Sequence, residues 1–313
     1  MSRAAKKPRS TGSASTRTRE RTVRARDLAP PIPRSLLDPL VAAALAEDVG
    51  SGDVTTELTV PATAMVRGRI VAKAPLVLAG TFVADRVFAL VDPRISLRWR
   101  AADGDEVAPG TVVAELAGPA RGVLVGERLA LNFLQRLSGI ATQTRAYVRA
   151  VTGTKARVVD TRKTTPGLRT LEKWAVRAGG GGNHRTGLSD GILIKDNHIA
   201  AAGGITAAVR AAKEGAPHTL LVEVEVEDLR GLDEALRAGA DAVLLDNFAE
   251  SDWAAAVARV DGRARVEISG NMDVRRARLA ALAGADIISV GALTHSVTAA
   301  DLSLRLDRLR RRA

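Results

Sequence analysis

The second half of the chain repeats one hydrophobic pattern. Beyond residue 155, a short run of β-branched and aliphatic residues ends in a charged or small residue, and a segment with helical periodicity follows. Apolar runs that alternate with helical segments predict parallel strands whose faces are covered by helices. We therefore predict a (β/α) barrel, and an incomplete one because six runs are clear. The predicted strands are residues 156–160, 191–195, 220–226, 241–246, 265–269 and 285–290.

The first half of the chain mixes helical and extended segments without a regular alternation. Apolar residues recur at helical spacing in three stretches. These are residues 35–50 with Gly50 as C-terminal cap, 81–92 with Thr81 as N-cap, and 125–151, which predicts one long helix or two. The other residues predict extended chain at 51–59, a strand pair at 67–80, and short strands over 95–125 with turns at 103–104, 109–110 and 118–119.

The predicted fold class is α/β, with two domains. Residues 29–137 form an N-terminal α+β sandwich domain, and residues 138–294 form the C-terminal incomplete (β/α) barrel that we expect to be catalytic. Residues 1–28 precede both domains. We leave open whether the chain returns to the N-terminal domain over residues 295–313.

The net charge of +11 belongs mostly to the N-terminal tail. Residues 1–34 contain ten Lys and Arg and two acidic residues, a net charge of +8, which leaves +3 for the rest of the chain. Val23 is the only large apolar residue before Leu28, so we predict a disordered tail. A solvated run of charge is the preferred interpretation, while loose contact with RNA or phospholipid and an organelle transit peptide are the alternatives.

The composition argues against several classes of protein. No apolar run approaches the ~20 residues of a membrane helix, and the tail lacks the apolar core of a secretory signal, so we expect no membrane partner. The nearly balanced charge after residue 34 argues against a specific nucleic-acid partner. The chain contains no cysteine, which excludes disulfides and thiol nucleophiles and fits a cytoplasmic location.

Positive side chains gather between residues 160 and 198. Two predicted strands end inside this segment, and in such barrels the chemistry lies at the carboxyl ends of the strands. We therefore expect these cations at the barrel mouth, where they would bind a polyanion. They are Arg162, Lys163, His184, Arg185 and Lys195.

Two acidic residues are predicted at the same mouth. Glu225 lies inside an alternating strand and Asp246 ends the next one, so both should project toward the mouth. A buried carboxylate needs a cation, which makes Lys163, Lys195 or Mg²⁺ natural companions. Structural ion pairing would explain either acid alone, whereas both acids facing a cationic rim favour catalysis.

Glycines at two late strand ends predict a phosphate site. Residues 267–272 and 290–296 each place a glycine between a strand and a helical segment, where backbone N–H groups bind phosphate. The alternative is that Gly270 and Gly291 serve only tight turns. The chain has no G-x-x-x-x-G-K-[ST] loop and no G-x-G-x-x-G motif, and its four dispersed histidines do not predict a metal site.

Several of these stretches together resemble the quinolinate phosphoribosyltransferase family. The longest begins at Asp160 and reads DTRKTTPGLRTLEKWAVRAGGGGNHRTGLSDGILIKDNHI. The resemblance extends over about residues 36–309, and only the basic tail departs from the pattern. The other stretches are EDVGSGDVTT, LVGERLALNFLQRLSGIATQT, VEVEVEDL, ADAVLLDNF, ISGNM and ISVGALTHS.

The resemblance implies an enzyme, a carboxylating nicotinate-nucleotide diphosphorylase of the pentosyltransferase class. Such an enzyme moves the 5-phosphoribosyl group from phosphoribosyl pyrophosphate to the ring nitrogen of quinolinate. Carbon dioxide and pyrophosphate leave, and nicotinate mononucleotide enters NAD biosynthesis. Quinolinate and phosphoribosyl pyrophosphate are the implied partners, and Mg²⁺ bound with phosphoribosyl pyrophosphate is the implied cofactor.

The resemblance also implies roles for single residues, among which Lys163, Glu225 and Asp246 are the expected catalytic groups. The quinolinate carboxylates would be surrounded by Arg128, Arg162, Lys163, His184 and Arg185. Lys195 would meet the pyrophosphate with Thr161 nearby. Glu225 and Asp246 would hold the ribose hydroxyls and, largely through the substrate, Mg²⁺. The 5-phosphate would be bound by Ser269, Gly270, Asn271, Val290, Gly291 and Ala292.

The family resemblance implies a homodimer or a higher even oligomer with shared active sites. The small domain of one subunit would cover the barrel mouth of its partner, and whether Arg128 serves its own or the neighbouring site stays open. Two rival hypotheses remain. A phosphoribosyltransferase for nicotinate or another acid would release no carbon dioxide from quinolinate. A nucleic-acid-binding protein would depend on the tail, and its affinity would fall steeply with salt.

Overall fold

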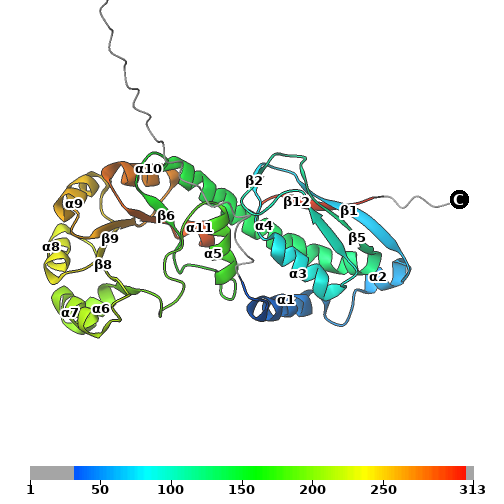
Figure 1. Ribbon diagram of the computed structural model, residues 1–313, viewed down its shortest axis with the longest axis horizontal. Coiled ribbons are helices and arrows are strands. Elements are labelled where there is room, and N and C mark those ends of the chain that lie inside the picture. The colour runs from blue at the N-terminus through cyan, green and yellow to red at the C-terminus, as the bar shows by residue number, and fades with distance from the viewer. Residues whose placement is uncertain (1–31, 308–313) are drawn as a thin grey trace, which may run out of the picture.

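The computed structural model describes residues 32–307. The predicted disordered tail, residues 1–28, lies outside the described residues, as do residues 308–313. Figure 1 shows a barrel and a smaller sheet domain side by side, joined by one long helix, α4. Among the described residues, no helix is long and apolar enough to cross a membrane.

The barrel contains six parallel strands, as predicted. Their order is β6-β11-β10-β9-β8-β7, so the barrel is open between β6 and β7. A segment from the loop after α5 closes part of this opening, because Gly182 forms an isolated parallel bridge with Val159 of β6. The strands are β6 Arg157–Val159, β7 Ile192–Ile194, β8 Val222–Val226, β9 Ala242–Asp246, β10 Arg265–Ser269 and β11 Ile287–Ser289.

Helices cover the outside of the barrel in Figure 1. Several of them bury apolar side chains, such as Leu232 of α8 and Trp253 of α9, both almost fully buried. The helices are α5 Arg169–Ala178, α6 Asp196–Ala202, α7 Ile205–Gly215, α8 Leu229–Ala238, α9 Trp253–Val260 after the short 3₁₀ turn η2 Glu250–Asp252, α10 Val274–Ala283 and α11 Ala292–His295.

The N-terminal domain packs helices against one antiparallel sheet of order β12-β1-β5-β3. The last described strand, β12, pairs with β1, so the chain comes back to this domain after the barrel. The strands are β1 Met65–Ala72, β3 Ser96–Trp99, β5 Val112–Pro119 and β12 Leu302–Leu306, with a separate pair of β2 Leu76–Val77 and β4 Glu106–Val107. The helices are α1 Arg34–Val49, α2 Val54–Thr59 and α3 Thr81–Val91.

Three local predictions in this domain were wrong. Residues 54–59 form helix α2 instead of extended chain, because the Asp53 side chain accepts a hydrogen bond from the Thr56 amide and caps the first turn. The N-cap of α3 is Gly80, in a left-handed conformation, and not Thr81. The predicted turn at 118–119 is the end of β5, which continues directly into α4.

Helix α4, Ala120–Ala150, is a single element that connects the two domains. Its first half buries Leu129 and Phe133 in the N-terminal domain, and its last turns reach the barrel, where the Tyr147 hydroxyl donates to the Met272 carbonyl at 3.0 Å. Between them Gly139 lies so close to the chain before β12 that a Cβ there would meet the Thr298 carbonyl oxygen at 2.2 Å. Only glycine permits this crossing.

Candidate active site

The carboxyl ends of the barrel strands surround a cavity of about 430 Å³. Most of the residues predicted for the site line this cavity together, so the predicted barrel mouth is a single cavity. They are Thr161, Arg162, Lys163, His184, Arg185, Lys195, Glu225, Asp246, Ser269, Gly270 and Asn271. The other lining residues are Leu193, Leu244, Asn247, Glu267 and Ser289.

One side of the cavity carries two guanidinium groups. Arg162 lies in the loop after β6, and its buried Nε has no hydrogen-bond partner among the described residues. Arg185 lies on the loop that crosses the open side of the barrel; burial, and then the charge of Arg162, lowers its pKa. A buried, unsatisfied donor next to a second guanidinium is a site for an anionic group, because a carboxylate would satisfy the donor and offset the repulsion.

A buried ion pair holds these two cationic loops together. Asp160 is fully buried and pairs with Lys173 of α5. The same carboxylate accepts hydrogen bonds from the His184 amide at 2.9 Å and from Asn183 Nδ2 at 2.6 Å. Lys173 also donates to the His184 carbonyl at 3.0 Å. The loop that carries His184 and Arg185 is thus attached to the end of β6 through one carboxylate.

Replacing Lys173 by methionine is expected to lower the free energy of unfolding by about 3–5 kcal/mol, because Asp160 would remain buried without its cation. Urea unfolding measures the change. The matched control is Lys213→Met, which breaks the half-exposed pair between Lys213 and Asp241 and should cost about 0–1 kcal/mol. Equal losses in the two variants would contradict the structural role given to Lys173.

A second buried network fixes the loop that carries Lys163. Arg136 of α4 contacts the buried Glu172 at 2.6 Å and the Thr165 hydroxyl at 2.7 Å. The Thr294 hydroxyl donates to the Lys163 carbonyl at 2.7 Å, and the Thr294 carbonyl accepts from Arg136 at 3.0 Å. Helix α4 therefore positions the Lys163 backbone while its side chain stays exposed toward the cavity.

The opposite side of the cavity carries the two predicted acids. Glu225 of β8 pairs with Lys195 at the end of β7. Asp246 ends β9 and accepts a hydrogen bond from Asn247 Nδ2 at 2.7 Å. Asp246 forms no ion pair with a described residue, so one predicted acid faces the cavity without a protein cation and the other shares one.

The turn after β10 comes very close to the end of β9. Gly270 has φ +97°, and a Cβ there would lie 2.2 Å from the Asn247 side-chain oxygen. Asn247 and Asn271 also adopt positive φ angles. The following helix α10 is already capped by the Asp273 side chain, which accepts from the Arg276 amide at 2.6 Å. An anion at this end of the strands would therefore be bound by the turn after β10 more than by the N-terminus of α10.

Four predicted site residues do not line the cavity. Arg128 is exposed on α4 in the N-terminal domain. Val290 is buried, Ala292 begins α11, and Gly291 lies against the side chain of Lys163, where a Cβ would approach the Lys163 Cδ to 3.0 Å. Gly291 thus leaves room for Lys163.

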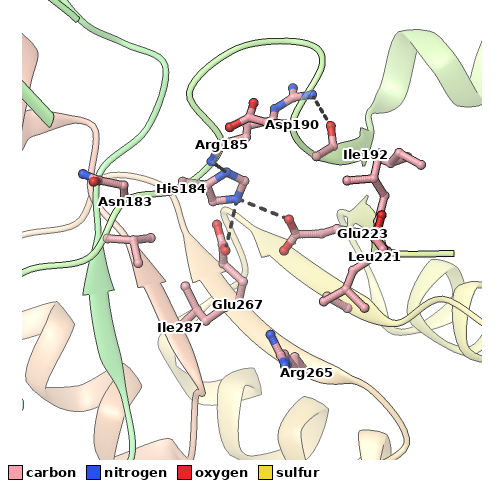
Figure 2. Close-up of a pocket in the computed structure, with 15 residues that line it drawn as sticks. Asn183, His184, Arg185, Asp190, Ile192, Leu221, Glu223, Arg265, Glu267 and Ile287 are labelled. Carbon is pink, nitrogen blue, oxygen red and sulfur yellow. Dashed lines mark hydrogen bonds and ion pairs between the residues drawn. The ribbon is translucent and has the colours of Figure 1, made fainter. Parts of the chain in front are cut away.

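The structure also groups acids that the sequence interpretation missed. His184 points into the barrel, and its Nε2 lies 3.2 Å from Glu223 and 3.4 Å from Glu267 (Figure 2). The carboxylates of Glu223 and Glu267, which face Nε2, raise the pKa of His184 and favour a proton on that nitrogen. The alternation VEVEV in β8 was the available signal, since Glu223 and Glu225 must face the same side of the strand.

Comparisons with known proteins agree with this arrangement. The models "Quinolinate phosphoribosyl transferase, N-terminal domain" and "C-terminal domain" match residues 53–138 and 140–305. The chain is 46% identical over 271 residues to the "Nicotinate-nucleotide pyrophosphorylase [carboxylating]" of Mycobacterium leprae, covering 84% of this chain and 94% of that protein. It is 41% identical over 283 residues to "Quinolinate phosphoribosyltransferase [decarboxylating] 1" of Nicotiana glauca, covering 84% and 80%. The solved nicotinate-nucleotide pyrophosphorylase from Francisella tularensis superposes with a TM-score of 0.84 at 41% identity, covering 88% and 98%.

Proposed function

The chain belongs to the quinolinate phosphoribosyltransferase family, and we propose how its barrel mouth performs that family's reaction. It transfers the 5-phosphoribosyl group of phosphoribosyl pyrophosphate to quinolinate, with loss of carbon dioxide and pyrophosphate, and forms nicotinate mononucleotide for NAD biosynthesis. The observation that supports the assignment of residues is the single cavity that has cations on one side and acids and a glycine turn on the other.

Quinolinate occupies the cationic side in this proposal. The planar guanidinium groups of Arg162 and Arg185 bind the two carboxylates of the pyridine diacid. One of these carboxylates accepts a hydrogen bond from the Arg162 Nε that is otherwise unsatisfied. Lys163 and His184 complete this side. Lys163 adds a compact positive charge at the point where the diacid and the sugar phosphate meet.

Phosphoribosyl pyrophosphate occupies the other side. Glu225 and Asp246 bind the ribose hydroxyls, and Lys195, with Thr161 nearby, binds the pyrophosphate. The turn at Ser269, Gly270 and Asn271 binds the 5-phosphate through its backbone N–H groups. Val290, Gly291 and Ala292 border that phosphate from the next strand, although they do not line the cavity.

The donor set at this side fits Mg²⁺, which we propose as the cofactor. Asp246 forms no ion pair within the described part of the chain, and carboxylate and phosphate oxygens are the ligands that Mg²⁺ prefers. Asp246 and Glu225 would hold the ion, largely through the substrate. When bound, Mg²⁺ neutralises charge that develops on the departing pyrophosphate.

The remaining chemistry needs no covalent intermediate with the protein. Departure of pyrophosphate leaves positive charge on the ribose carbon, which Glu225 and Asp246 stabilise from fixed positions. The quinolinate nitrogen then attacks that carbon. The carboxylate next to the nitrogen leaves as carbon dioxide, and the positive ring nitrogen and neighbouring cations stabilise the electron pair that stays on the ring carbon.

The choice of acceptor tests this assignment. The purified protein with phosphoribosyl pyrophosphate and Mg²⁺ should use quinolinate at least about 10²-fold better than nicotinate in kcat/KM, because cations built for a second carboxylate stay unpaired with the monoacid. Pyridine nucleotide formation measures both rates. A preference for nicotinate would instead support the rival phosphoribosyltransferase.

We also propose a homodimer, or a higher even oligomer, with shared active sites. Arg128 is too far along α4 to line the cavity of its own chain, although the family resemblance assigns it to quinolinate. A second copy whose N-terminal domain covers the mouth would bring Arg128 to the partner's site. This arrangement also gives a reason for an exposed arginine at that point of α4.

Mixing two inactive variants tests the shared site. Arg128→Ala and Lys163→Ala homodimers should each be nearly inactive, and random subunit exchange should restore about one quarter of wild-type activity, because half of the sites in mixed dimers have both residues intact. Activity is measured before and after exchange. Without any regain of activity, Arg128 would act within its own subunit or not at all.

The location and the tail remain separate proposals. The cysteine-free sequence supports a cytoplasmic location. We propose no specific nucleic-acid partner, because the charge excess lies mainly in residues 1–34. Removal of residues 1–27 should therefore leave the activity unchanged.

A further inference from the structure

The proposed reaction consumes a proton that none of the roles above supplies. When the ring loses carbon dioxide, the carbon–carbon bond breaks and its electron pair stays on the ring carbon. That pair must take up a proton to form the C–H bond of the product. An acid beside this carbon matters, because otherwise carbon dioxide held in the closed site can recombine with the electron pair.

His184, Glu223 and Glu267, here called the acid triad, lie directly beneath the cationic side of the cavity. Glu267 is 1% exposed, and neither of its oxygens has a hydrogen-bond partner among residues 32–307; Glu223 Oε1 also lacks one there. His184 and Glu267 line the mouth cavity. Buried carboxylate oxygens without donors are costly unless a proton or a metal ion neutralises them.

The hydrogen bonds of His184 favour a proton over a metal ion. Its Nδ1 accepts from the Arg185 amide at 2.8 Å, so the ring carries its proton on Nε2. A histidine that binds a metal through Nε2 would instead donate an Nδ1–H to its neighbour. Figure 2 shows this ring nitrogen facing both carboxylates.

One N–H between two buried carboxylates leaves room for a second proton. Because Nδ1 already accepts from the Arg185 amide, a second proton lies between the two carboxylates, and the triad holds it at neutral pH. The nearby charges are Arg162 and Arg185 above the triad and Arg265 below it.

A second cavity, of about 340 Å³, reaches the triad from the opposite end of the barrel. Its walls come from the amino ends of the strands, including Leu221, Arg265 and Ile287, and from the loop across the open side of the barrel, residues 183–185 and 190–191. The cavity also contacts Glu223 and Glu267 (Figure 2). Substrates that fill the mouth would leave this lower cavity open to solvent. The triad can therefore regain a proton without opening the mouth.

From this geometry we propose that the acid triad is the proton donor for the ring carbon that loses carbon dioxide, and that it is refilled through the lower cavity. The proposal rests on the proposed function. The triad gives one proton to the electron pair on the ring carbon, a C–H bond forms, and the triad then takes one proton from solvent. No oxidant or further reactant is needed.

Single-turnover measurements separate this role from binding. In Glu267→Gln, release of pyrophosphate should stay within about 3-fold of wild type, while formation of nicotinate mononucleotide should fall by about 10²-fold, the usual effect of a lost general acid. The undecarboxylated mononucleotide should accumulate. Glu223→Gln should act in the same direction, and Glu214→Gln, on the exposed face of α7, should change neither rate.

Several results would overturn the proposal. The Glu267→Gln and Glu223→Gln proteins should first be shown to keep the wild-type thermal midpoint. If they then slow both steps equally, the triad is a positioning element. If they raise only the KM for quinolinate, the triad is a binding element. An unchanged rate of nucleotide formation would leave Lys163 as the donor. One tightly bound transition metal per chain, lost in Glu267→Gln, would make the triad a metal site. If wild type releases no pyrophosphate from these substrates, the proposed function itself fails.

Discussion

Replacing Lys163 by alanine is expected to lower kcat/KM by about 10²–10³-fold, a loss of about 2.7–4 kcal/mol of transition-state stabilisation. Lys163 projects from a loop whose backbone is fixed by Thr294, and Gly291 leaves space for its side chain. The backbone that carries the ammonium is therefore fixed before any substrate arrives. Steady-state rates with quinolinate and phosphoribosyl pyrophosphate measure the loss.

Two further variants separate charge from shape. Lys163→Arg should recover only part of the activity, because a planar, delocalised guanidinium does not reproduce the compact charge of the ammonium. Lys155→Ala, which removes an exposed lysine paired with Asp286 on the outside of the barrel, should behave like wild type. Full activity in Lys163→Ala would show that the charge at this position does not act on the transition state.

Replacing Asp246 by asparagine is expected to lower kcat by a similar factor of about 10²–10³ while the protein stays folded. An asparagine has the same shape and can still accept the hydrogen bond from Asn247. The change therefore removes negative charge from the cavity and little else. The charge of Asp246 serves two proposed functions, namely stabilisation of the positive ribose carbon and binding of Mg²⁺, and the substitution weakens both.

The dependence on Mg²⁺ distinguishes these two functions. If Asp246 helps to hold the ion, the Mg²⁺ concentration for half-maximal rate should rise in Asp246→Asn, and kcat should remain low at saturating Mg²⁺. Asp301→Ala, which removes an exposed acid 3.7 Å from Lys73, is the matched control and should change neither quantity. A variant that regains wild-type kcat at high Mg²⁺ would limit Asp246 to metal binding.

The barrel could be predicted from the sequence because most of its strands are compact apolar runs with a polar residue at or just after the carboxyl end. Such a run keeps its conformation through burial on both faces, so local pattern and final structure agree. Helix α2 could not be read in this way. It is short and polar, and the Asp53 cap, which periodicity does not reveal, decides its conformation.

The site was predictable where a residue ends a strand and much less so where it comes from elsewhere. Asp246, Lys195 and Arg162 follow barrel strands, so a fold prediction already places them at one mouth. Glu267 was missed although it lies in the middle of a predicted strand, because a buried acid is unfavourable without a partner and the sequence does not show that His184 faces it. The position of Arg128 depends on a partner chain, which no pattern within one sequence locates.

The release of carbon dioxide per pyrophosphate tests the central claim most directly, namely that one cavity holds a pyridine diacid against an activated sugar phosphate. Quinolinate labelled in the carboxylate next to the ring nitrogen, incubated with the purified protein, phosphoribosyl pyrophosphate and Mg²⁺, should release one labelled carbon dioxide for each pyrophosphate formed. Pyrophosphate without labelled carbon dioxide, or neither product, would contradict the account.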